Sequence, residues 1–248
     1  MSSHILHKPQ RELNGMSLYF FQDVAIIVFS RGENRLNLEF VQTLDTLLDD
    51  VQSSETCKGL ITTGSGKFYG NGLDLEWMAT LTQPDLYSFI STFQRLLKRI
   101  LYFPLPTLAA LNGHAYAGGA LFAFAHDLRT FHQGKGWLCL NEVFIERRFS
   151  DFHLSFLKIK VGYGKNLTDA VVLGRRFTPE EAFTAGLTHA IPKESVLLAE
   201  SVRLLKAFHG KSGYPRDSLA NMKEDVYRDC LAAYEKDIQR FGDLASKL

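Results

Sequence analysis

The sequence predicts a layered α/β fold, and three observations favour it. Short apolar stretches that resemble strands alternate with segments whose apolar residues recur at helical spacing. Several of the strand-like stretches run into glycine-rich turns, as strands do when they feed helices in a layered sheet. With 248 residues and 46% hydrophobic content, the chain suits one sizeable globular domain or a domain with an appended helical part.

The beginning of the chain supplies a hairpin, a helix and a further strand. After a polar lead-in over residues 1–16, residues 18–21 and 24–29 predict two short strands joined by a tight turn. Residues 38–51 place six apolar side chains at helical spacing, so a covering helix follows the strand pair. Residues 60–63 predict a strand that leads into a glycine-rich turn.

The middle of the chain repeats this order. Helical spacing returns over residues 86–100 and ends before Pro104-Leu105-Pro106. Residues 107–111 predict a buried strand, which delivers the chain to Gly113 and then to the pair Gly118-Gly119. Because this pair enters an apolar run, it indicates the N-terminus of a buried helix.

The last third is predicted to be mainly helical. The segment Thr178-Pro179-Glu180-Glu181 combines a capping residue, a proline in the first turn and a glutamate three residues after the cap, which indicates a helix start. From Tyr214 onward an apolar stripe that ends at Phe241 predicts one long amphipathic helix. Such a stripe needs a partner, which can be the same chain or another subunit.

Composition and charge argue against several classes of protein. The formal net charge is +1, so the chain has neither a polybasic footprint for nucleic acid nor an acidic tail. We expect no membrane span and no signal peptide, because no run approaches 18 apolar residues and the N-terminus lacks the pattern. Cys57, Cys139 and Cys230 are widely spaced, which predicts buried thiols rather than a disulfide or a metal site.

Two glycine-rich turns are candidates for backbone N–H groups that bind an anion. The first N–H groups of a helix that begins at Gly118 lack partners inside the helix. The turn Gly70-Asn71-Gly72 can present a second free N–H at Leu73. Two donors that converge on one oxygen form an oxyanion hole, and losing one donor typically raises the barrier by about 2.7 to 4 kcal/mol.

Glu142 is the candidate general base. A carboxylate removes protons best at neutral pH when apolar surroundings raise its pKa toward 7. The residues around Glu142 in the sequence are mostly apolar. The local sequence alone is equally consistent with a surface or paired carboxylate.

Four blocks of the sequence together resemble the crotonase (enoyl-CoA hydratase/isomerase) superfamily. They are GSGKFYGNGLDL at 64–75, PTLAALNGHAYAGG at 106–119, DLR at 127–129 and LNE at 140–142. They occur in the family's order and at close to its spacing, and weaker similarity extends over residues 18–191. The resemblance implies a crotonase (ClpP-like) spiral of β-β-α units with a C-terminal helical part.

The resemblance also implies a division of the chain and a way of assembling. The core domain with the active site would cover residues 1–195, with a last strand block over 185–192. A C-terminal helical region over 196–248 would pack over the core and against neighbouring subunits, so a homotrimer or hexamer is expected.

The same resemblance implies roles for individual residues. The backbone N–H groups of Leu73 and Gly118 would bind a thioester oxygen, and Glu142 would be the catalytic residue. The substrate would be an acyl-CoA bound by Asn71, Gly72, Leu73, Asp74 and Leu75. Coenzyme A would be part of the substrate, and no further cofactor would be needed. The tight turn gives Asp74 an alternative role as a cap for backbone N–H groups.

The residue at position 121 distinguishes hydration from isomerisation of the double bond. Hydratases of the family use two glutamates, and an alignment on Asp127 places Leu121 where the second glutamate would stand. Since leucine cannot carry a proton, we expect the isomerisation of 3-enoyl-CoA to trans-2-enoyl-CoA by Glu142 alone. The alternatives are a hydratase or thioester hydrolase that takes its second acid from Glu146 or Asp151, and a non-catalytic acyl-CoA-binding protein.

The final tripeptide, Ser246-Lys247-Leu248, matches a peroxisomal targeting signal that a receptor reads at a free C-terminus. We therefore expect the peroxisomal import receptor as a partner and the peroxisomal matrix as the location. This location suits the chemistry, because peroxisomes degrade fatty acyl-CoA thioesters by β-oxidation.

Overall fold

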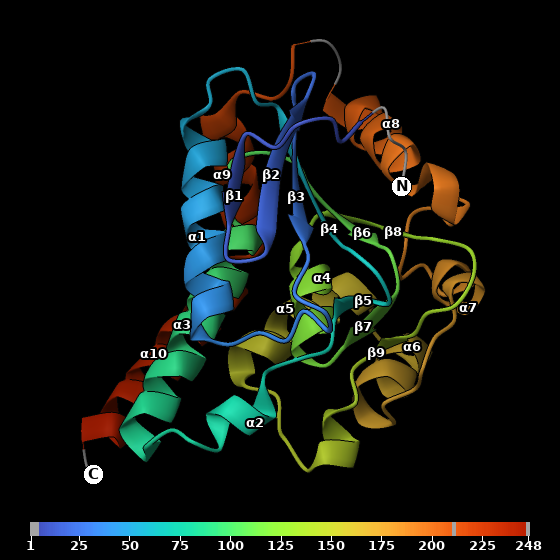
Figure 1. Cartoon of the computed structure of the whole chain (residues 1–248). Helices are drawn as coiled ribbons and strands as arrows, with labels where there is room; N and C mark the ends of the chain where they lie inside the picture. The colour runs from blue at the N-terminus through green and yellow to red at the C-terminus, as the bar shows by residue number, and fades with distance from the viewer. Residues whose placement is uncertain (1–4, 210–211, 247–248) are drawn as a thin grey trace.

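The computed structural model describes residues 5–209 and 212–246 (Figure 1). Lys247 and Leu248 of the predicted targeting signal lie outside the described residues. Within the described part of the chain, no helix combines the length and the apolar character that crossing a membrane requires.

The larger sheet has six strands in the order β1-β2-β3-β4-β6-β8. The pairs β1·β2 and β2·β3 are antiparallel, and the remaining pairs are parallel. The predicted hairpin is confirmed as β2 and β3, and the predicted strands over 60–63 and 107–111 are confirmed as β4 and β6. The bounds are β1 Arg11–Leu13, β2 Met16–Phe21, β3 Val24–Phe29, β4 Gly59–Gly64, β6 Thr107–Leu111 and β8 Leu128–Phe131.

Strand β1 lies inside the segment 1–16, which is predicted to be a polar lead-in, and this prediction is wrong for residues 11–13. A three-residue strand at the sheet edge needs only backbone pairing, and two of its three residues are exposed. The sequence of β1 therefore carries no apolar pattern from which the strand could be predicted.

A second, smaller sheet of three parallel strands has the order β5-β7-β9. Its strands are β5 Phe68–Gly70, β7 His114–Tyr116 and β9 Leu138–Cys139. Strands of two or three residues are too short for an alternating pattern, and none of these three is predicted from the sequence. This sheet is the frame of the candidate site.

Both faces of the larger sheet are buried at its central strands, β3, β4 and β6. In β3, Ala25, Ile27 and Phe29 belong to one core with the helix α1 (Leu38–Ser53), the predicted covering helix. The alternate residues Val24, Ile26 and Val28 belong to a second core with α8 (Leu197–His209), which covers the opposite face (Figure 1). A strand buried on both faces explains the continuous apolar run in its sequence.

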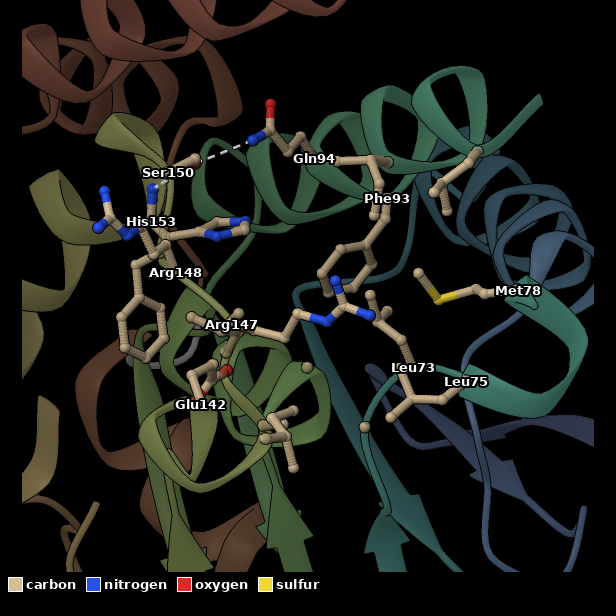
Figure 2. A pocket seen from close by; sticks show the side chains of 18 of the residues that line it. Leu73, Leu75, Met78, Phe93, Gln94, Glu142, Arg147, Arg148, Ser150 and His153 are labelled. Atoms are coloured by element: carbon tan, nitrogen blue, oxygen red, sulfur yellow. Dashed lines mark hydrogen bonds between the residues drawn. The ribbon is translucent and has the colours of Figure 1, made fainter. Parts of the chain in front are cut away.

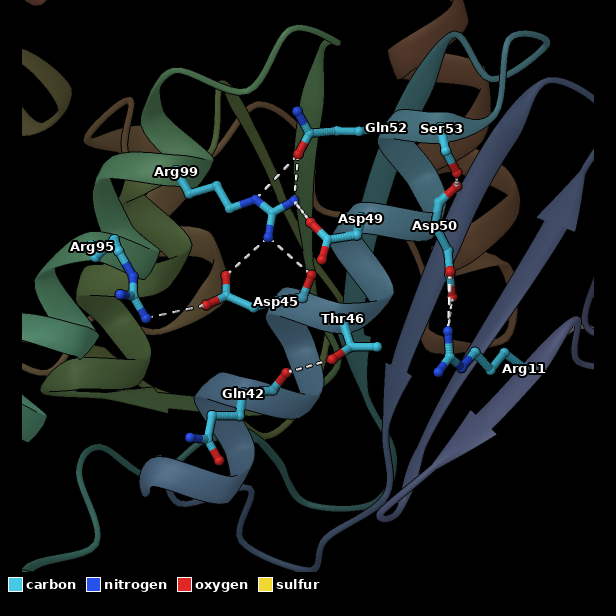
Figure 3. A network of polar contacts seen from close by, with 10 residues as sticks. All are labelled: Arg11, Gln42, Asp45, Thr46, Asp49, Asp50, Gln52, Ser53, Arg95 and Arg99. Carbon is cyan, nitrogen blue, oxygen red and sulfur yellow. Dashed lines mark hydrogen bonds and ion pairs between the residues drawn. The ribbon is translucent and has the colours of Figure 1, made fainter.

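Helix α3 (Gln83–Leu101), predicted over 86–100, is tied to α1 by a polar network (Figure 3). Arg99 donates hydrogen bonds to the backbone oxygen and Oδ1 of Asp45 at 2.9 and 3.1 Å and to Oδ1 of Asp49 at 2.6 Å. It also donates to Gln52 on the last turn of α1. This network fixes α3, whose other side lines the cavity described below.

Among the remaining helices, α4 packs on the smaller sheet and α10 packs on α3. The predicted helix start at Thr178 is confirmed, because Thr178 and Glu181 form a reciprocal capping box. The segment 185–192 forms no strand; a single isolated bridge joins its Ala190 to Thr130, and another joins Lys193, just beyond it, to Gln133. The bounds are α2 Leu75–Met78, α4 Gly118–Ala125, α5 Asp151–Val161, α6 Lys165–Leu167, α7 Pro179–Thr184, α9 Arg216–Val226 and α10 Arg228–Ser246, with short 3₁₀ helices at Glu142–Ile145 (η1) and Glu194–Val196 (η3) and a π-helical turn at Thr168–Val172 (η2).

The prediction of one long C-terminal helix is wrong, because the chain breaks at Tyr227 into α9 and α10. Met222 and Val226 of the expected stripe are 60% and 61% exposed. Lys223 is buried in their place and forms an ion pair of 2.7 Å with Asp127. The α9 helix is therefore oriented by this ion pair rather than by the apolar stripe. Helix α10 packs on α3 and α5 of the same chain.

Candidate active site

The three residues with predicted chemistry follow the three strands of the smaller sheet. Because β5, β7 and β9 are parallel, their C-terminal ends meet at one edge. Leu73 lies three residues beyond the end of β5, Gly118 two residues beyond β7 and Glu142 three residues beyond β9. All three line one cavity of about 600 Å³ (Figure 2). The structure thus brings together residues that lie up to 69 positions apart in the sequence.

The backbone around Leu73 leaves its N–H free to bind a ligand. Leu36 donates to the oxygen of Gly72 at 2.9 Å, and Asp74 donates to the oxygen of Leu36 at 2.9 Å. These two bonds use the groups on either side of Leu73, so its own N–H points away from Leu36. Within the described part of the chain, neither this N–H nor that of Gly118 donates to a backbone oxygen.

The turn before α4 holds the second donor in a constrained position. Ala117 has φ 44° and ψ −119°, a backbone conformation that a residue with a Cβ adopts only at a cost in free energy. Its N–H donates to the oxygen of Cys139 at 2.9 Å, which links the turn to β9. A Cβ on Gly119 would lie 2.3 Å from the oxygen of Gly70, so only glycine lets α4 start against the end of β5.

Glu142 is a buried carboxyl group on the wall of this cavity. It begins η1 and is 6% exposed, and its Oε2 is buried with no hydrogen-bond partner among the described residues. Burial disfavours the charged form and raises the pKa of Glu142 to about 7. The carboxyl group can therefore both accept and return a proton near neutral pH.

Glu142 is the one carboxyl group among the described residues that line the cavity. Leu121 lines it too and is 3% exposed, so an apolar side chain stands at the position where the resemblance to hydratases implies a second glutamate. Glu146 ends the η1 turn in a left-handed conformation, and it is exposed and absent from the cavity lining. Asp151 is engaged in an ion pair with Lys236 at 2.9 Å. Neither alternative acid lines the cavity.

The predicted substrate loop lies along the cavity with one exception. Asn71, Gly72, Leu73 and Leu75 line the cavity, whereas Asp74 does not. The Oδ1 of Asp74 accepts a hydrogen bond from the Trp77 N–H at 3.2 Å and so caps α2. This is the alternative role that the turn chemistry indicates.

Other lining residues come from helices that sequence reasoning did not connect with the site. Apolar side chains form much of the wall, and Arg147 and Arg148 follow η1 (Figure 2). Two buried polar residues, Gln94 on α3 and His153 on α5, also line the cavity. Each interrupts an apolar helical face in the sequence, which is the only signal that distinguishes them. The apolar wall includes Leu86, Tyr87, Ile90, Phe93, Phe149 and Phe241.

Comparisons with known proteins agree on the fold and on the family. A family model described as enoyl-CoA hydratase/isomerase matches residues 20–247. The peroxisomal enoyl-CoA delta isomerase 2 of Arabidopsis thaliana is 30% identical over 204 residues, which cover 79% of this chain and 85% of that protein. A putative enoyl-CoA hydratase of Thermus thermophilus is 30% identical over 186 residues, which cover 73% and 72%.

A solved structure supports the same fold. The human mitochondrial delta3-delta2-enoyl-CoA isomerase matches this chain with a TM-score of 0.83, over 94% of this chain and 93% of that one. At 22% identity this likeness concerns the fold alone. The predicted spiral of β-β-α units with C-terminal helices is confirmed.

Proposed function

The chain belongs to the enoyl-CoA hydratase/isomerase family, or crotonase superfamily, and within it we propose that the protein is a Δ3,Δ2-enoyl-CoA isomerase of fatty acid β-oxidation. One observation carries the proposal: among the described residues, Glu142 is the one carboxyl group in the cavity, which it shares with two backbone N–H groups and with the apolar Leu121. One acid suffices for moving a double bond, whereas adding water requires a group that activates the water.

The proposed reaction is a proton transfer within one substrate. The thioester oxygen of a 3-enoyl-CoA accepts hydrogen bonds from the N–H groups of Leu73 and Gly118. The carboxylate of Glu142 removes a proton from C2, and the electron pair of the C–H bond moves onto the thioester to form a dienolate. The two N–H groups stabilise the negative charge on the oxygen.

Glu142 then returns the same proton to C4. The double bond now lies between C2 and C3, the thioester carbonyl is restored and the carboxylate is regenerated. Atoms and electrons balance without water, metal or redox cofactor, and coenzyme A belongs to the substrate. The pKa of about 7 for Glu142 suits both halves of the transfer, because the group is a usable base and a usable acid at neutral pH.

The alternatives receive less support from the geometry. A hydratase or hydrolase would need a second acid, and neither Glu146 nor Asp151 lines the cavity. A non-catalytic acyl-CoA-binding protein would be favoured by a site filled with bulky side chains, but the cavity of about 600 Å³ is open. Because one relative is named as a putative enoyl-CoA hydratase, hydration should be assayed beside isomerisation.

Location and assembly are part of the proposal. A peroxisomal matrix location, with import by a receptor that reads Ser246-Lys247-Leu248, is supported by the name of the Arabidopsis relative. A homotrimer or hexamer is supported by exposed apolar side chains on η1 and η2, among them Phe144 and Val172. Imaging of a fluorescent fusion with and without the tripeptide tests the location, and light scattering tests the assembly.

The central experiment assays the purified full-length chain with 3-hexenoyl-CoA and no added cofactor. The expected product is trans-2-hexenoyl-CoA, detected by its conjugated thioester absorbance and by mass spectrometry. A parallel assay with trans-2-hexenoyl-CoA measures the 3-hydroxyacyl product. The proposal is wrong if the chain hydrates the 2-enoyl substrate faster than it isomerises the 3-enoyl substrate.

A further inference from the structure

The cavity contains a second polar region, separate from Glu142. Gln94 on α3 and His153 on α5 line the cavity and are 0% and 9% exposed. The Oε1 of Gln94 and the Nε2 of His153 are both buried, and neither has a hydrogen-bond partner among the described residues. In Figure 2 these two side chains and Ser150 lie together at one end of the view, away from Glu142 and Leu73.

Local contacts hold both side chains in place. The Nε2 of Gln94 donates to the Oγ of Ser150 at 2.9 Å, so the amide oxygen is the atom left without a partner. The same Ser150 Oγ accepts from the His153 N–H at 3.3 Å and caps α5. The His153 ring packs against Phe93 and Phe156, each with a centroid distance of 6.3 Å. Neither group can easily rotate toward bulk water.

The imidazole of His153 is neutral at physiological pH. Burial lowers its pKa to about 4, and Asp237, whose side chain accepts from the Phe152 N–H at 2.9 Å, opposes this shift only in part. A neutral imidazole has one nitrogen that donates and one that accepts. The Nε2 of His153 can therefore donate a hydrogen bond to a ligand, and the Oε1 of Gln94 can accept one.

An apolar acyl chain would leave both of these atoms without partners. Buried polar atoms without partners are costly, and a site built to hydrogen-bond a substrate hydroxyl rejects the analogue that lacks it. The surrounding wall is apolar, with Ile90, Phe93 and Phe149 among its members. A ligand that fits this region therefore needs an apolar chain that carries one polar group.

We propose that Gln94, Ser150 and His153 form a hydroxyl-binding subsite, and that the protein prefers acyl-CoA thioesters whose chain carries a hydroxyl group. The hydroxyl donates to the Oε1 of Gln94 and accepts from the Nε2–H of His153. Because the subsite lies away from Glu142, the hydroxyl belongs to a carbon beyond the reacting ones. The inference rests on the proposed function for the thioester, and it deepens that function by naming a class of substrate.

The test uses unreactive ligands, so that it does not depend on catalysis. Calorimetry with the full chain compares dodecanoyl-CoA with a series of hydroxydodecanoyl-CoA isomers that carry the hydroxyl at successive carbons from C5 to C12. We expect at least one isomer to bind about tenfold tighter than dodecanoyl-CoA. Conversion of 3-hexenoyl-CoA by the same preparation reports separately on the proposed isomerase function.

Variants then assign the preference to the subsite. In Gln94→Met and His153→Leu, which keep apolar volume and remove the hydrogen-bonding atoms, the preference should fall to within about twofold. Met222→Leu, at an exposed position of α9 outside the cavity, should keep it. Thermal unfolding of each variant confirms that it is folded.

Two results would overturn the inference. One is equal affinity of the wild-type chain for dodecanoyl-CoA and for every hydroxy isomer, which would mean that the subsite holds only water. The other is a preference that persists undiminished in both polar-to-apolar variants, which would place hydroxyl recognition elsewhere. The wild-type comparison needs no variant and decides by itself whether a preference exists.

Discussion

The backbone nitrogen of Leu73 lies 3.4 Å from the point that a Cβ atom on Gly118 would occupy. The Cδ2 and Cγ atoms of the Leu73 side chain lie 3.2 and 3.3 Å from the same point. The two proposed oxyanion donors thus belong to segments that touch, and their spacing depends on the missing side chain at Gly118.

Substitution of this glycine is expected to reduce activity without unfolding the protein. In Gly118→Ala the new methyl group must displace Leu73, so one donor loses its alignment and kcat should fall roughly 10- to 100-fold. Steady-state kinetics with 3-hexenoyl-CoA measures the effect. The control is Gly242→Ala on α10, where nothing lies within 4 Å of the new atom. Equal kinetics in the two variants would argue against the oxyanion role.

Loss of the Glu142 carboxylate is expected to abolish proton transfer. Glu142→Gln keeps the shape of the side chain but cannot accept a proton, so kcat should fall by about 10² to 10⁴. Binding of hexanoyl-CoA, measured by calorimetry, should remain within a few fold of the wild type. Full activity in this variant would remove Glu142 as the base.

The activity of the wild type should follow the ionisation of Glu142. Because the base must be deprotonated and its pKa is raised to about 7, kcat/KM should rise tenfold per pH unit below that value and level off above it. Rates at constant ionic strength from pH 5 to 9 measure this profile. A profile without an inflection between pH 6 and 8 would contradict the assignment.

The same pKa predicts how stability depends on pH. The folded state holds the Glu142 proton up to about pH 7, whereas the unfolded state releases it near the ordinary value of 4.5. The contribution of Glu142 to the free energy of unfolding is therefore fully present below pH 4.5 and is lost as the pH rises through 7. The total loss is at most about 3 kcal/mol. Urea unfolding should show Glu142→Gln gaining stability over the wild type at pH 8 but not at pH 4.

A second acid at position 121 should change the products. Leu121→Glu places a carboxyl group in the cavity beside Glu142, where it can activate water, so the ratio of 3-hydroxyacyl product to isomerised product should increase. Chromatography of the products from trans-2-hexenoyl-CoA and 3-hexenoyl-CoA measures the ratio. Leu121→Gln has nearly the same size and no proton to exchange, and it should leave the ratio unchanged. The interpretation of Leu121 fails if the two variants behave alike.

The ion pair between Lys223 and Asp127 should be important for stability. Lys223 also donates to the oxygens of Phe103 and Leu105 at 2.9 and 3.2 Å, and its removal leaves the carboxylate of Asp127 poorly compensated. Lys223→Met should lower the free energy of unfolding by about 3 kcal/mol. The control is Lys236→Met, which removes a solvent-exposed ion pair. Its free energy of unfolding, measured by the same urea titration, should equal that of the wild type.

Much of the fold could be predicted from the sequence because its longer elements carry local patterns. The hairpin of β2 and β3, the helices α1 and α3 and the capping box of α7 were all predicted correctly. The break between α9 and α10 could not be predicted in this way. It accompanies an ion pair between Lys223 and Asp127, 96 positions apart, which no pattern within the C-terminal segment indicates.

The candidate site was only partly predictable for a similar reason. Leu73, Gly118 and Glu142 each lie in a short block with a recognisable motif, so they could be named in advance. Gln94 and His153 carry no motif, and their place in the cavity results from the packing of α3 against α5 through Ser150. Polar residues inside otherwise apolar helical faces are the feature to search for in related sequences.

The position of Leu73 and Gly118 at the ends of two short parallel strands affects how this enzyme family can diversify. Replacing one nucleotide can erase the Glu142 carboxyl group, yet no replacement other than proline deletes a main-chain amide. Descendants that lose the proposed base would keep both proposed N–H donors to a thioester oxygen, provided that the loops keep their shape. New chemistry could then arise by changing the side chains that face the carbonyl, while the means of activating it is inherited intact.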